Sequence, residues 1–322
     1  MIVIKKYIFW ALALMLVIVF SIGGYRYFSQ GYNLNIYALD TVIGIRVYGP
    51  GAQNAVEKAA QRIYELDAVF NRHNPQSEVS HINQNASAAS VKVSDEVYGV
   101  LETALDISRN TGGAFDITIG PLSSLWNIGN ATAPPSDDEI NHLLPLVGYQ
   151  NIHLKDGTVF FSQPEMQIDL GGIAKGYIGD QTAELLRELG IQSAVLDLGG
   201  NVVTIGGKQD DQPFSVAIKN PLDGSGPLKI VQSVDTNIVT SGGYERFFVH
   251  NGTTYHHILD PATGRPSNSD YASVTVIGRN GIVCDALSTA IFVRGNLGDL
   301  AQTYNVRIIT LSNDGTLYDT EG

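Results

Sequence analysis

Apolar residues recur every three or four positions in two stretches of the chain, and this spacing predicts amphipathic helices over residues 52–70 and 93–110. A glycine-rich turn leads into a third predicted helix over 177–189, which Gly190 ends, and a fourth helix is predicted over 285–293. Helices are therefore expected along the whole length of the chain and not in one block.

A second pattern, in which β-branched and aromatic residues alternate with polar ones, predicts strands. Strands are expected at 34–48 (one strand or a bent pair), 193–198, 202–205, 214–218, 230–234, 247–250 and 272–277, with a hairpin over 151–162 that turns at Asp156-Gly157. Residues 71–80 are expected to form a polar loop. Because strands and helices are interspersed without a regular βαβ alternation, we predict an α+β fold of mixed, largely antiparallel sheets with interspersed helices.

The beginning of the chain has the pattern of a membrane anchor. Lys5 and Lys6 precede an apolar run over 7–22 that contains no charged residue. With its flanks, this run is long enough to span a hydrocarbon core of about 30 Å. Neither a small-residue cleavage site nor a cysteine follows it, so we expect one uncleaved N-terminal transmembrane helix with the lysines inside. Residues 1–29 are thus predicted to anchor an exported domain, residues 30–322, on the extracytoplasmic side of the cell membrane.

The charge balance excludes one class of partner. The chain has 32 acidic and 20 basic residues, a formal net charge of −12. Lys5, Lys6 and Arg26 lie in the N-terminal segment, so the exported part has 32 acidic against 17 basic residues, a net charge of −15. A nucleic-acid surface needs clustered Lys and Arg, and no nucleic-acid partner is expected. The single Cys284 forms no internal disulfide, and the 34 glycines exceed the usual share of about 7%, which indicates special backbone conformations or a close ligand.

Two segments carry donors that suit phosphate and metal chemistry. Gly171, Gly172 and Lys175 lie in a turn expected to join a strand to a helix, where backbone N–H groups hold phosphates. A tight turn with a solvated lysine is the alternative. Asp285 and Thr289 lie four residues apart, so both oxygens project from one face at the start of the predicted helix and suit Mg²⁺. The alternative is that Asp285 only caps the helix and Thr289 bonds back to the preceding turn.

A third candidate is a histidine at the junction of a short strand and a turn. His257 belongs to YHHILDPATGRP, and histidine is the side chain best suited to proton transfer near neutral pH. A structural role for it is the alternative, and the sequence does not choose between it and His256. The aromatic-rich segment 112–126 has a composition that could cover a planar ligand ring, although Phe115 and Trp126 are residue types typical of a core.

Five segments of the chain, in order, match the pattern of one family. They are LDAVFNRHNPQSEVSHIN, TGGAFDITIGPLSSLW, IDLGGIAKGYIGDQTAELLRELGI, TSGGYERFF with YHHILDPATGRP, and SVTVIG followed by DALSTA. On these segments the chain resembles, over residues 39–295, the ApbE family, the FAD:protein FMN transferases. The resemblance implies an exported, Mg²⁺-dependent enzyme that takes FAD as substrate and cleaves its pyrophosphate. FMN would pass through a phosphoester bond to a Thr or Ser hydroxyl of an acceptor flavoprotein, with release of AMP.

The resemblance also implies roles for individual residues. His257, as general base, and Asp285 are the implied catalytic residues, and the implied magnesium ligands are Asp285, Thr289 and the carbonyl of Gly172. Flavin and adenine contacts are implied for Leu39, His73, Ala114, Phe115, Asp116, Asp169, Lys175 and Leu259. The chain departs from the family pattern at Leu39-Asp40-Thr41 in place of Met-Gly-Thr, at His73 where relatives often have Tyr, and at Gly243 where many have Asp.

Two other functions would use parts of the same site. FAD pyrophosphatase activity, which yields FMN and AMP, results if water replaces the protein hydroxyl. A non-catalytic flavin-binding protein would use Asp285 and Thr289 only to build its helix. For a transferase, the resemblance implies acceptors such as membrane redox flavoproteins or exported FMN-carrying reductases.

Overall fold

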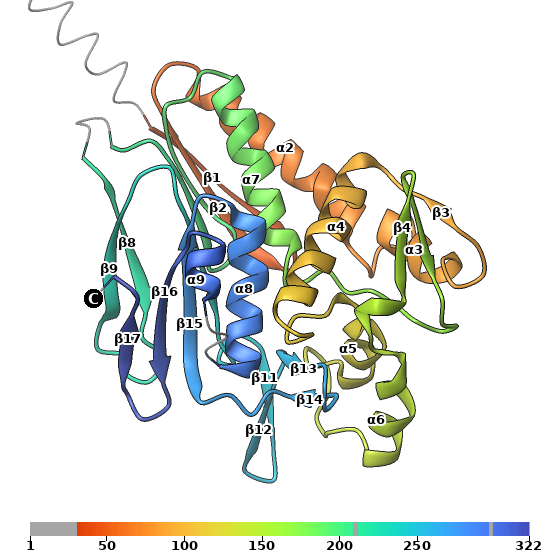
Figure 1. Ribbon diagram of the computed structural model, residues 1–322. Coiled ribbons are helices and arrows are strands. Elements are labelled where there is room, and N and C mark those ends of the chain that lie inside the picture. The colour runs from red at the N-terminus through yellow and green to blue at the C-terminus, as the bar shows by residue number, and fades with distance from the viewer. Residues whose placement is uncertain (1–30, 209–211, 296–298, 322) are drawn as a thin grey trace, which may run out of the picture.

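One antiparallel sheet of eight strands organises the part of the chain that the computed structural model describes, residues 31–208, 212–295 and 299–321 (Figure 1). In order across the sheet, its strands are β1 (Gly31–Ala38), β2 (Thr41–Tyr48), β6 (Ser193–Asp197), β7 (Asn201–Ile205), β10 (Asn237–Ser241), β15 (Tyr271–Gly278), β16 (Arg307–Ser312) and β17 (Leu317–Asp319). Every neighbouring pair is antiparallel. The predicted α+β class with largely antiparallel sheets is confirmed.

The predicted anchor, residues 1–29, lies outside the described residues. Within the described part of the chain, no helix combines the length and the apolar composition that crossing a membrane requires. Gly31 is the first residue of β1, which is an edge strand of the main sheet.

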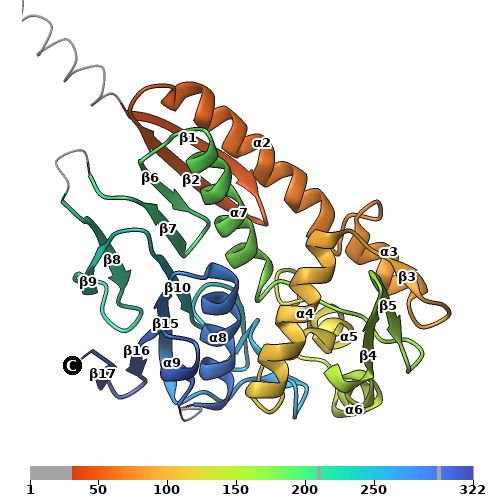
Figure 2. The ribbon, with the colours of Figure 1, turned by 45° about the horizontal axis from the view of Figure 1, so that its top comes forward.

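Three helices lie on one face of the main sheet (Figure 1, Figure 2). They are α2 (Ala52–Phe70), which packs on β1 and β2, α7 (Ala174–Glu188), which packs on β7, and α8 (Gly281–Arg294), which packs on β10 and β15. The helix α2 has the bounds that its apolar spacing predicts. In α8, by contrast, eleven of fourteen residues are buried, and a helix that is apolar all round has little amphipathic spacing. The predicted start of this helix at residue 285 is therefore wrong by one turn.

A hairpin covers part of the other face of the sheet. It consists of β8 (Phe214–Lys219) and β9 (Pro227–Ser233). Its residues Ile218 and Val231 form a separate apolar cluster with Ile238, Ile277 and Ile309 of the main sheet. The middle of the main sheet is therefore buried from both sides.

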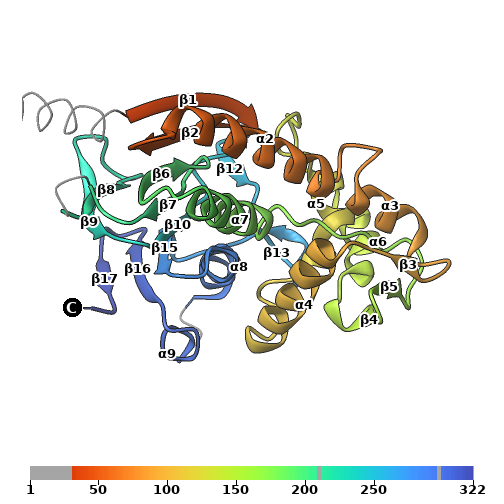
Figure 3. The ribbon, with the colours of Figure 1, turned by 90° about the horizontal axis from the view of Figure 1, so that it is seen from above.

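A second group of elements stands to one side of the main sheet (Figure 3). It contains α3 (Glu78–Asn85), α4 (Asp95–Asn110), α5 (Gly120–Trp126), α6 (Asp137–Leu143) and a three-stranded sheet in the order β3 (Val91–Lys92), β5 (Thr158–Phe161), β4 (Ile152–Lys155). The β4–β5 hairpin confirms the predicted turn at Asp156-Gly157. The predicted polar loop over 71–80 ends too late, because the Ser77 side chain accepts the N–H of Ser80 and starts α3.

Short elements complete the fold. The strands β11 (Phe247–His250) and β12 (Thr253–His256) form a protruding hairpin, β13 (Leu259–Asp260) pairs with β14 (Arg265–Pro266), and α9 (Leu300–Thr303) precedes β16 (Figure 1). On the first hairpin, Phe248 and Tyr255 stack on each other, and Tyr255 also lies against Trp126 of α5. This stacking fixes the strand that ends immediately before His257.

The helices α7 and α8 cross so closely that glycine is required on each. A Cβ on Gly176 would overlap the carbonyl oxygen of Gly281 and would lie 2.8 Å from the Cβ of Asp285. A Cβ on Gly281 would lie 2.8 Å from the Gly176 oxygen. Close-packed interiors do not accommodate atoms at such distances without movement of the backbone.

Asp180, one turn after Gly176, holds the first turn of α8. Its carboxylate accepts the N–H of Ile282 and the side-chain amide of Asn237, each at 3.0 Å. Burial disfavours the charged form more than these hydrogen bonds favour it, and the pKa of Asp180 is raised to about 6. Asp180 therefore binds its proton more tightly in the folded chain than in the unfolded chain.

The close crossing predicts opposite effects of alanine at two helical glycines. Gly176→Ala should lower the free energy of unfolding by about 1–3 kcal/mol, because the added methyl forces α7 and α8 apart. The matched control is Gly99→Ala in α4, where a Cβ has no heavy atom of the surrounding structure within 4 Å. This control should gain about 0.4–1 kcal/mol, because alanine restricts the unfolded chain. Urea denaturation measures both changes, and a Gly176→Ala variant as stable as the wild type would contradict the close approach.

Asp180 should make stability depend on pH. Its pKa rises from 3.8 to about 6 on folding, so its contribution is fully present below about pH 4 and is lost as the pH rises through about 6. The Asp180→Asn variant should lose this part of the pH dependence, at most about 3 kcal/mol between pH 4 and 7. Denaturation of both proteins across this range measures the two slopes. Identical slopes would show that another group is responsible.

Candidate active site

The turn that leads into α7 lies against α8. A Cβ on Gly172 would lie 3.3 Å from the Thr289 Oγ1 and 3.3 Å from Cε2 of Phe115, so the backbone of this turn is in contact with both residues. The residue at the N-cap of α7, Ile173, makes no capping hydrogen bond with its side chain, and the helix begins at Ala174. The predicted junction of a glycine turn with a helix is thus present. The predicted strand before it is absent, since residues 166–170 belong to no strand.

Asp285 lies in the second turn of α8 and reaches across to α7. Its Oδ2 accepts the N–H of Gly176 at 2.9 Å, and the residue is only 3% exposed. The N-cap of α8 is Asn280, whose side chain accepts the N–H of Val283. The alternative that Asp285 caps the helix is therefore wrong. With Oδ2 engaged, Oδ1 is the oxygen that remains for a ligand.

Thr289 lies one turn after Asp285, as Gly172 lies one turn before Gly176. Its hydroxyl contacts the Oγ of Ser241 at 3.4 Å. The fold thus brings the three residues that the resemblance implies as magnesium ligands to one place between α7 and α8. In the described part of the chain, no three His, Cys, Asp or Glu side chains gather as a metal site. The group here is of another kind, with one carboxylate, one hydroxyl and one backbone carbonyl.

Asp169, just before the turn, is held by an arginine from a distant loop. The Nη1 of Arg72 lies 2.9 Å from the Asp169 Oδ2, and the N–H of Gly171 donates to Oδ1 at 2.9 Å. Burial opposes ionisation, but Arg72 and the N–H outweigh it, and the pKa of Asp169 is lowered. Arg72 also donates to the carbonyl of Gly120 at 3.0 Å. Sequence analysis missed Arg72, because a lone arginine in a polar loop carries no motif.

Lys175 and His257 are close enough for the charge of the lysine to act on the histidine. The Lys175 Nζ donates to the carbonyl of Gly171 at 3.3 Å, and the His257 Nδ1 lies 3.3 Å from the carbonyl of Arg246. His257 keeps an exposed surface, yet the protein packed around its ring disfavours the charged form. The cations Arg246 and Lys175 add to this effect, and the pKa of His257 is lowered to about 4. The ring is therefore neutral at pH 7.

The structure distinguishes His257 from its neighbour His256 by the surroundings of the two rings. The His256 Nε2 lies 3.0 Å from the carbonyl of Ser267, and its ring packs edge-on against Phe292. A Cβ on Gly243 would lie 2.7 Å from its Cδ2. Burial lowers the pKa of His256. His256 is thus a packing residue, and the departure from the family pattern at Gly243 makes room for its ring.

The turn between β1 and β2 is linked to the His257 segment through Arg246. Leu39 and Asp40 have φ values of 53° and 55°, a conformation that residues other than glycine seldom adopt. The Leu39 N–H donates to the Asp67 Oδ2 at 3.3 Å, and Arg246 donates to the carbonyl of Asp40 at 3.4 Å. Leu39, the first implied flavin contact, is therefore tied to the segment that leads to His257.

The side chains of Ala114, Phe115 and Asp116 are buried, and they differ in what they contact. Phe115 lies against Gly172, as described above. The Asp116 carboxylate accepts the N–H and the hydroxyl of Thr118, at 2.8 and 2.6 Å, and the N–H of Tyr149 at 2.9 Å. Burial raises the pKa of Asp116. Its carboxylate therefore joins its own loop to the segment that begins at Tyr149, whereas Phe115 adjoins the candidate ligands directly.

Two other implied contact residues lie in contrasting surroundings. The side chain of Leu259 is buried in the apolar cluster around Trp126, and His73 is exposed on the loop after α2. Trp126 itself is a core residue, as its type predicts, since it is 1% exposed and donates to the carbonyl of Gly264 at 2.7 Å.

Comparison with known proteins shows the family of this chain. The model of the ApbE family matches residues 39–307. The chain belongs to the ApbE family. It is 33% identical over 311 residues to a Treponema pallidum protein named FAD:protein FMN transferase, with 89% of this chain and 86% of the relative covered. A Vibrio cholerae protein of the same name is 34% identical over 235 residues, which cover 72% of this chain and 70% of the relative.

Solved ApbE structures share the fold. The ApbE protein of Thermotoga maritima has a TM-score of 0.84 at 31% identity, covering 91% of this chain and 97% of that one. The flavin transferase ApbE of Vibrio cholerae has a TM-score of 0.82 at 28% identity, covering 90% and 96%. The resemblance found in the five sequence segments is therefore confirmed.

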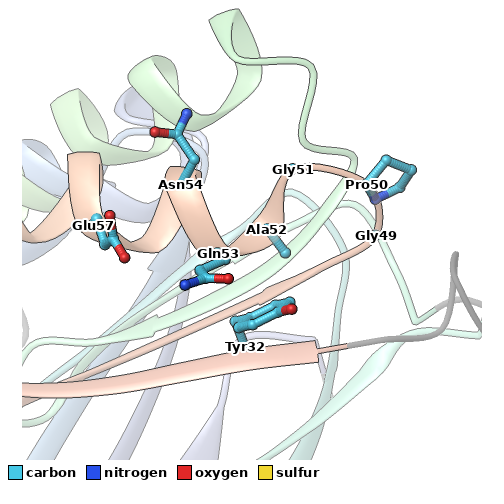
Figure 4. Close-up of a pocket in the computed structure, with 8 residues that line it drawn as sticks. All are labelled: Tyr32, Gly49, Pro50, Gly51, Ala52, Gln53, Asn54 and Glu57. Carbon is cyan, nitrogen blue, oxygen red and sulfur yellow. The ribbon is translucent and has the colours of Figure 1, made fainter.

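A pocket of about 420 Å³ at the N-terminus of α2 is separate from the ApbE candidate site (Figure 4). It is lined by Tyr32, Gly49, Pro50, Gly51, Ala52, Gln53, Asn54 and Glu57. None of these is an implied site residue, and the length of β1, about 20 Å, separates Tyr32 from Leu39. A groove of about 960 Å³ beside β16 and α9 likewise contains no implied site residue.

The surroundings of His257 predict an unusual titration for this ApbE protein. Its imidazole signals in ¹H–¹³C NMR should titrate with a midpoint near pH 4 and not near 6.5, with His257→Gln used to assign them. Lys175→Met should move the midpoint upward, because it removes one of the two cations. A wild-type midpoint of 6 or above would contradict the crowding and the charge effects together.

Proposed function

We propose that this chain is a Mg²⁺-dependent FAD:protein FMN transferase. It would cleave FAD, attach FMN through a phosphoester bond to a Thr or Ser of an acceptor flavoprotein, and release AMP. The names of the ApbE relatives support the transferase activity. The observation that carries the proposal is the meeting of Gly172, Asp285 and Thr289 where α7 crosses α8.

These three residues fit a magnesium ion by their chemistry. The Asp285 Oδ1, the Thr289 Oγ1 and the Gly172 carbonyl would hold it, and such hard oxygen donors leave further places for water or phosphate oxygens. Because Gly172 has no side chain, its backbone lies close to Thr289 and Phe115, where a Cβ would be crowded. When bound, Mg²⁺ supplies a Lewis acid that withdraws negative charge from the phosphates.

The residues of the turn would bind the pyrophosphate of FAD. Gly171 and Gly172 precede the N-terminus of α7, where the helix dipole favours an anion. Lys175 adds a positive charge in the first turn of the same helix. Phosphoryl transfer depends mostly on positioning and electrostatics, and these donors would provide both.

His257 would act as the general base. Its Nδ1–H donates to the carbonyl of Arg246, so Nε2 carries the lone pair that accepts a proton. The lowered pKa keeps the ring neutral at pH 7 and thus able to accept. The acceptor hydroxyl oxygen attacks the phosphorus of the FMN half, its proton passes to Nε2, and the P–O bond to AMP breaks.

We also propose that residues 1–29 anchor the enzyme in the cell membrane by a single span. The catalytic domain would lie on the extracytoplasmic side, where its acceptor would be a membrane or exported flavoprotein. The uncharged run over 7–22 after Lys5 and Lys6 supports this placement.

The test combines the purified full-length chain with FAD, MgCl₂ and membranes from source cells that lack the gene. A denaturing gel is then viewed for flavin fluorescence. Transfer should give a fluorescent protein band that survives denaturation, because the phosphoester bond is covalent. Free FMN without a labelled band indicates FAD pyrophosphatase activity, and intact FAD indicates binding alone. Either of these results contradicts the transferase proposal.

Two variants assign the parts of the reaction. Asp285→Ala should abolish labelling, and full activity in it would remove the metal assignment. His257→Ala should slow labelling by about 10²–10⁴-fold while FAD still binds. An unchanged rate in the second variant would mean that another group takes the proton.

A further inference from the structure

A short chain of hydroxyl groups lies behind the candidate ligand Thr289. Ser241, the last residue of β10, has its Oγ 3.4 Å from the Thr289 Oγ1 and 2.7 Å from the Ser288 Oγ. The Ser288 hydroxyl donates to the carbonyl oxygen of Asp285 at 2.9 Å. Ser288 is fully buried, and Ser241 and Thr289 are half-buried. Water therefore has restricted access to these hydrogen bonds.

The Asp285 carbonyl at the end of this chain of hydroxyl groups determines the direction in which each hydroxyl proton points. A carbonyl oxygen only accepts, and a serine hydroxyl has one proton, so the proton of Ser288 is directed to Asp285. Ser241 must then donate to Ser288, and its oxygen can accept only from Thr289. Each proton thus points away from the Thr289 oxygen, whose lone pairs are left for another partner.

We propose that Ser241 and Ser288 are positioning residues that hold the Thr289 hydroxyl with its lone pairs presented to a divalent cation. This proposal rests on the proposed function, in which Thr289 is a metal ligand. The two serines act through Thr289 and not on the substrate. Without Ser241, the Thr289 hydroxyl is free to turn its proton toward the cation, and the like charges then repel each other.

The neighbouring residue of the same strand provides a matched control. Side chains alternate along a strand, so Ser241 and Thr240 of β10 point to opposite faces of the sheet. The Thr240 Oγ1 shares a hydrogen bond with the Thr275 Oγ1 at 2.8 Å. Thr240 therefore has a hydroxyl on the same strand with a partner on β15, whereas the partners of Ser241 lie on α8.

The experiment measures the binding of Mn²⁺ alone to the full chain, by the loss of the free-ion signal in electron paramagnetic resonance. Ser241→Ala should weaken Mn²⁺ binding by about 10–100-fold, the usual effect of removing an outer partner of a metal ligand. Ser241→Thr keeps the hydroxyl on a residue that suits strands and should restore most of the affinity. Thr240→Val should bind Mn²⁺ as the wild type does.

Three results overturn the proposal. The first is an equal Mn²⁺ affinity in Ser241→Ala and wild type, and the second is a Mn²⁺ affinity in Ser241→Thr as low as that in Ser241→Ala. The third is a loss of Mn²⁺ affinity in Thr240→Val equal to that in Ser241→Ala. If thermal denaturation shows that Ser241→Ala does not fold, Ser288→Ala takes its place. In that variant Ser241 is free to donate to Thr289, and the same weakening is expected. A wild type that binds no Mn²⁺ is a separate result, because it removes the metal site on which the proposed function depends.

Discussion

The close crossing of α7 and α8 is the constraint from which the candidate site follows. Residues three or four apart on two antiparallel segments meet in order, Asp180 with Ile282, Gly176 with Asp285, and Gly172 with Thr289. The glycines bring the backbone of one helix within hydrogen-bonding distance of a carboxylate on the other. The same approach carries the turn before α7 onto α8. A wider crossing would leave the turn and the carboxylate as two unrelated features.

Although the protein is acidic as a whole, positively charged side chains gather around the candidate site. Three cations from separate segments, Arg72, Lys175 and Arg246, lie around the turn and His257. Arg72 is matched by Asp169, whereas burial, with Arg246 and Lys175 adding to it, lowers the pKa of His257 and keeps its ring neutral. The formal net charge of −12 does not attract an anion from a distance. Short-range donors around one turn must therefore provide the attraction that the molecule as a whole lacks.

Local patterns predict only those features whose causes are local. The helix α2 buries one face, so its bounds follow from the apolar spacing, but the start of the fully packed α8 does not. No local sequence pattern marks the roles of Arg72, Asp180 and Ser241, because their hydrogen-bond partners lie 97, 102 and 47 residues away. The choice between two adjacent histidines likewise depends on distant packing partners. The family resemblance points to the three candidate metal ligands that the fold brings together, while the Asp116 carboxylate is engaged by Thr118 and Tyr149.

The residues that meet at the crossing also make the formation of the candidate site depend on the order in which the chain folds. Gly176 and Asp285 are separated by 109 positions in the chain. The strands β6, β7, β10 and β15 lie between them, and closing so long a loop is favourable only once those strands have paired. A chain that is still emerging or only partly folded contains the turn and the helix without their junction. Catalytic competence is therefore a property of the finished fold, and an incomplete chain cannot consume its substrate.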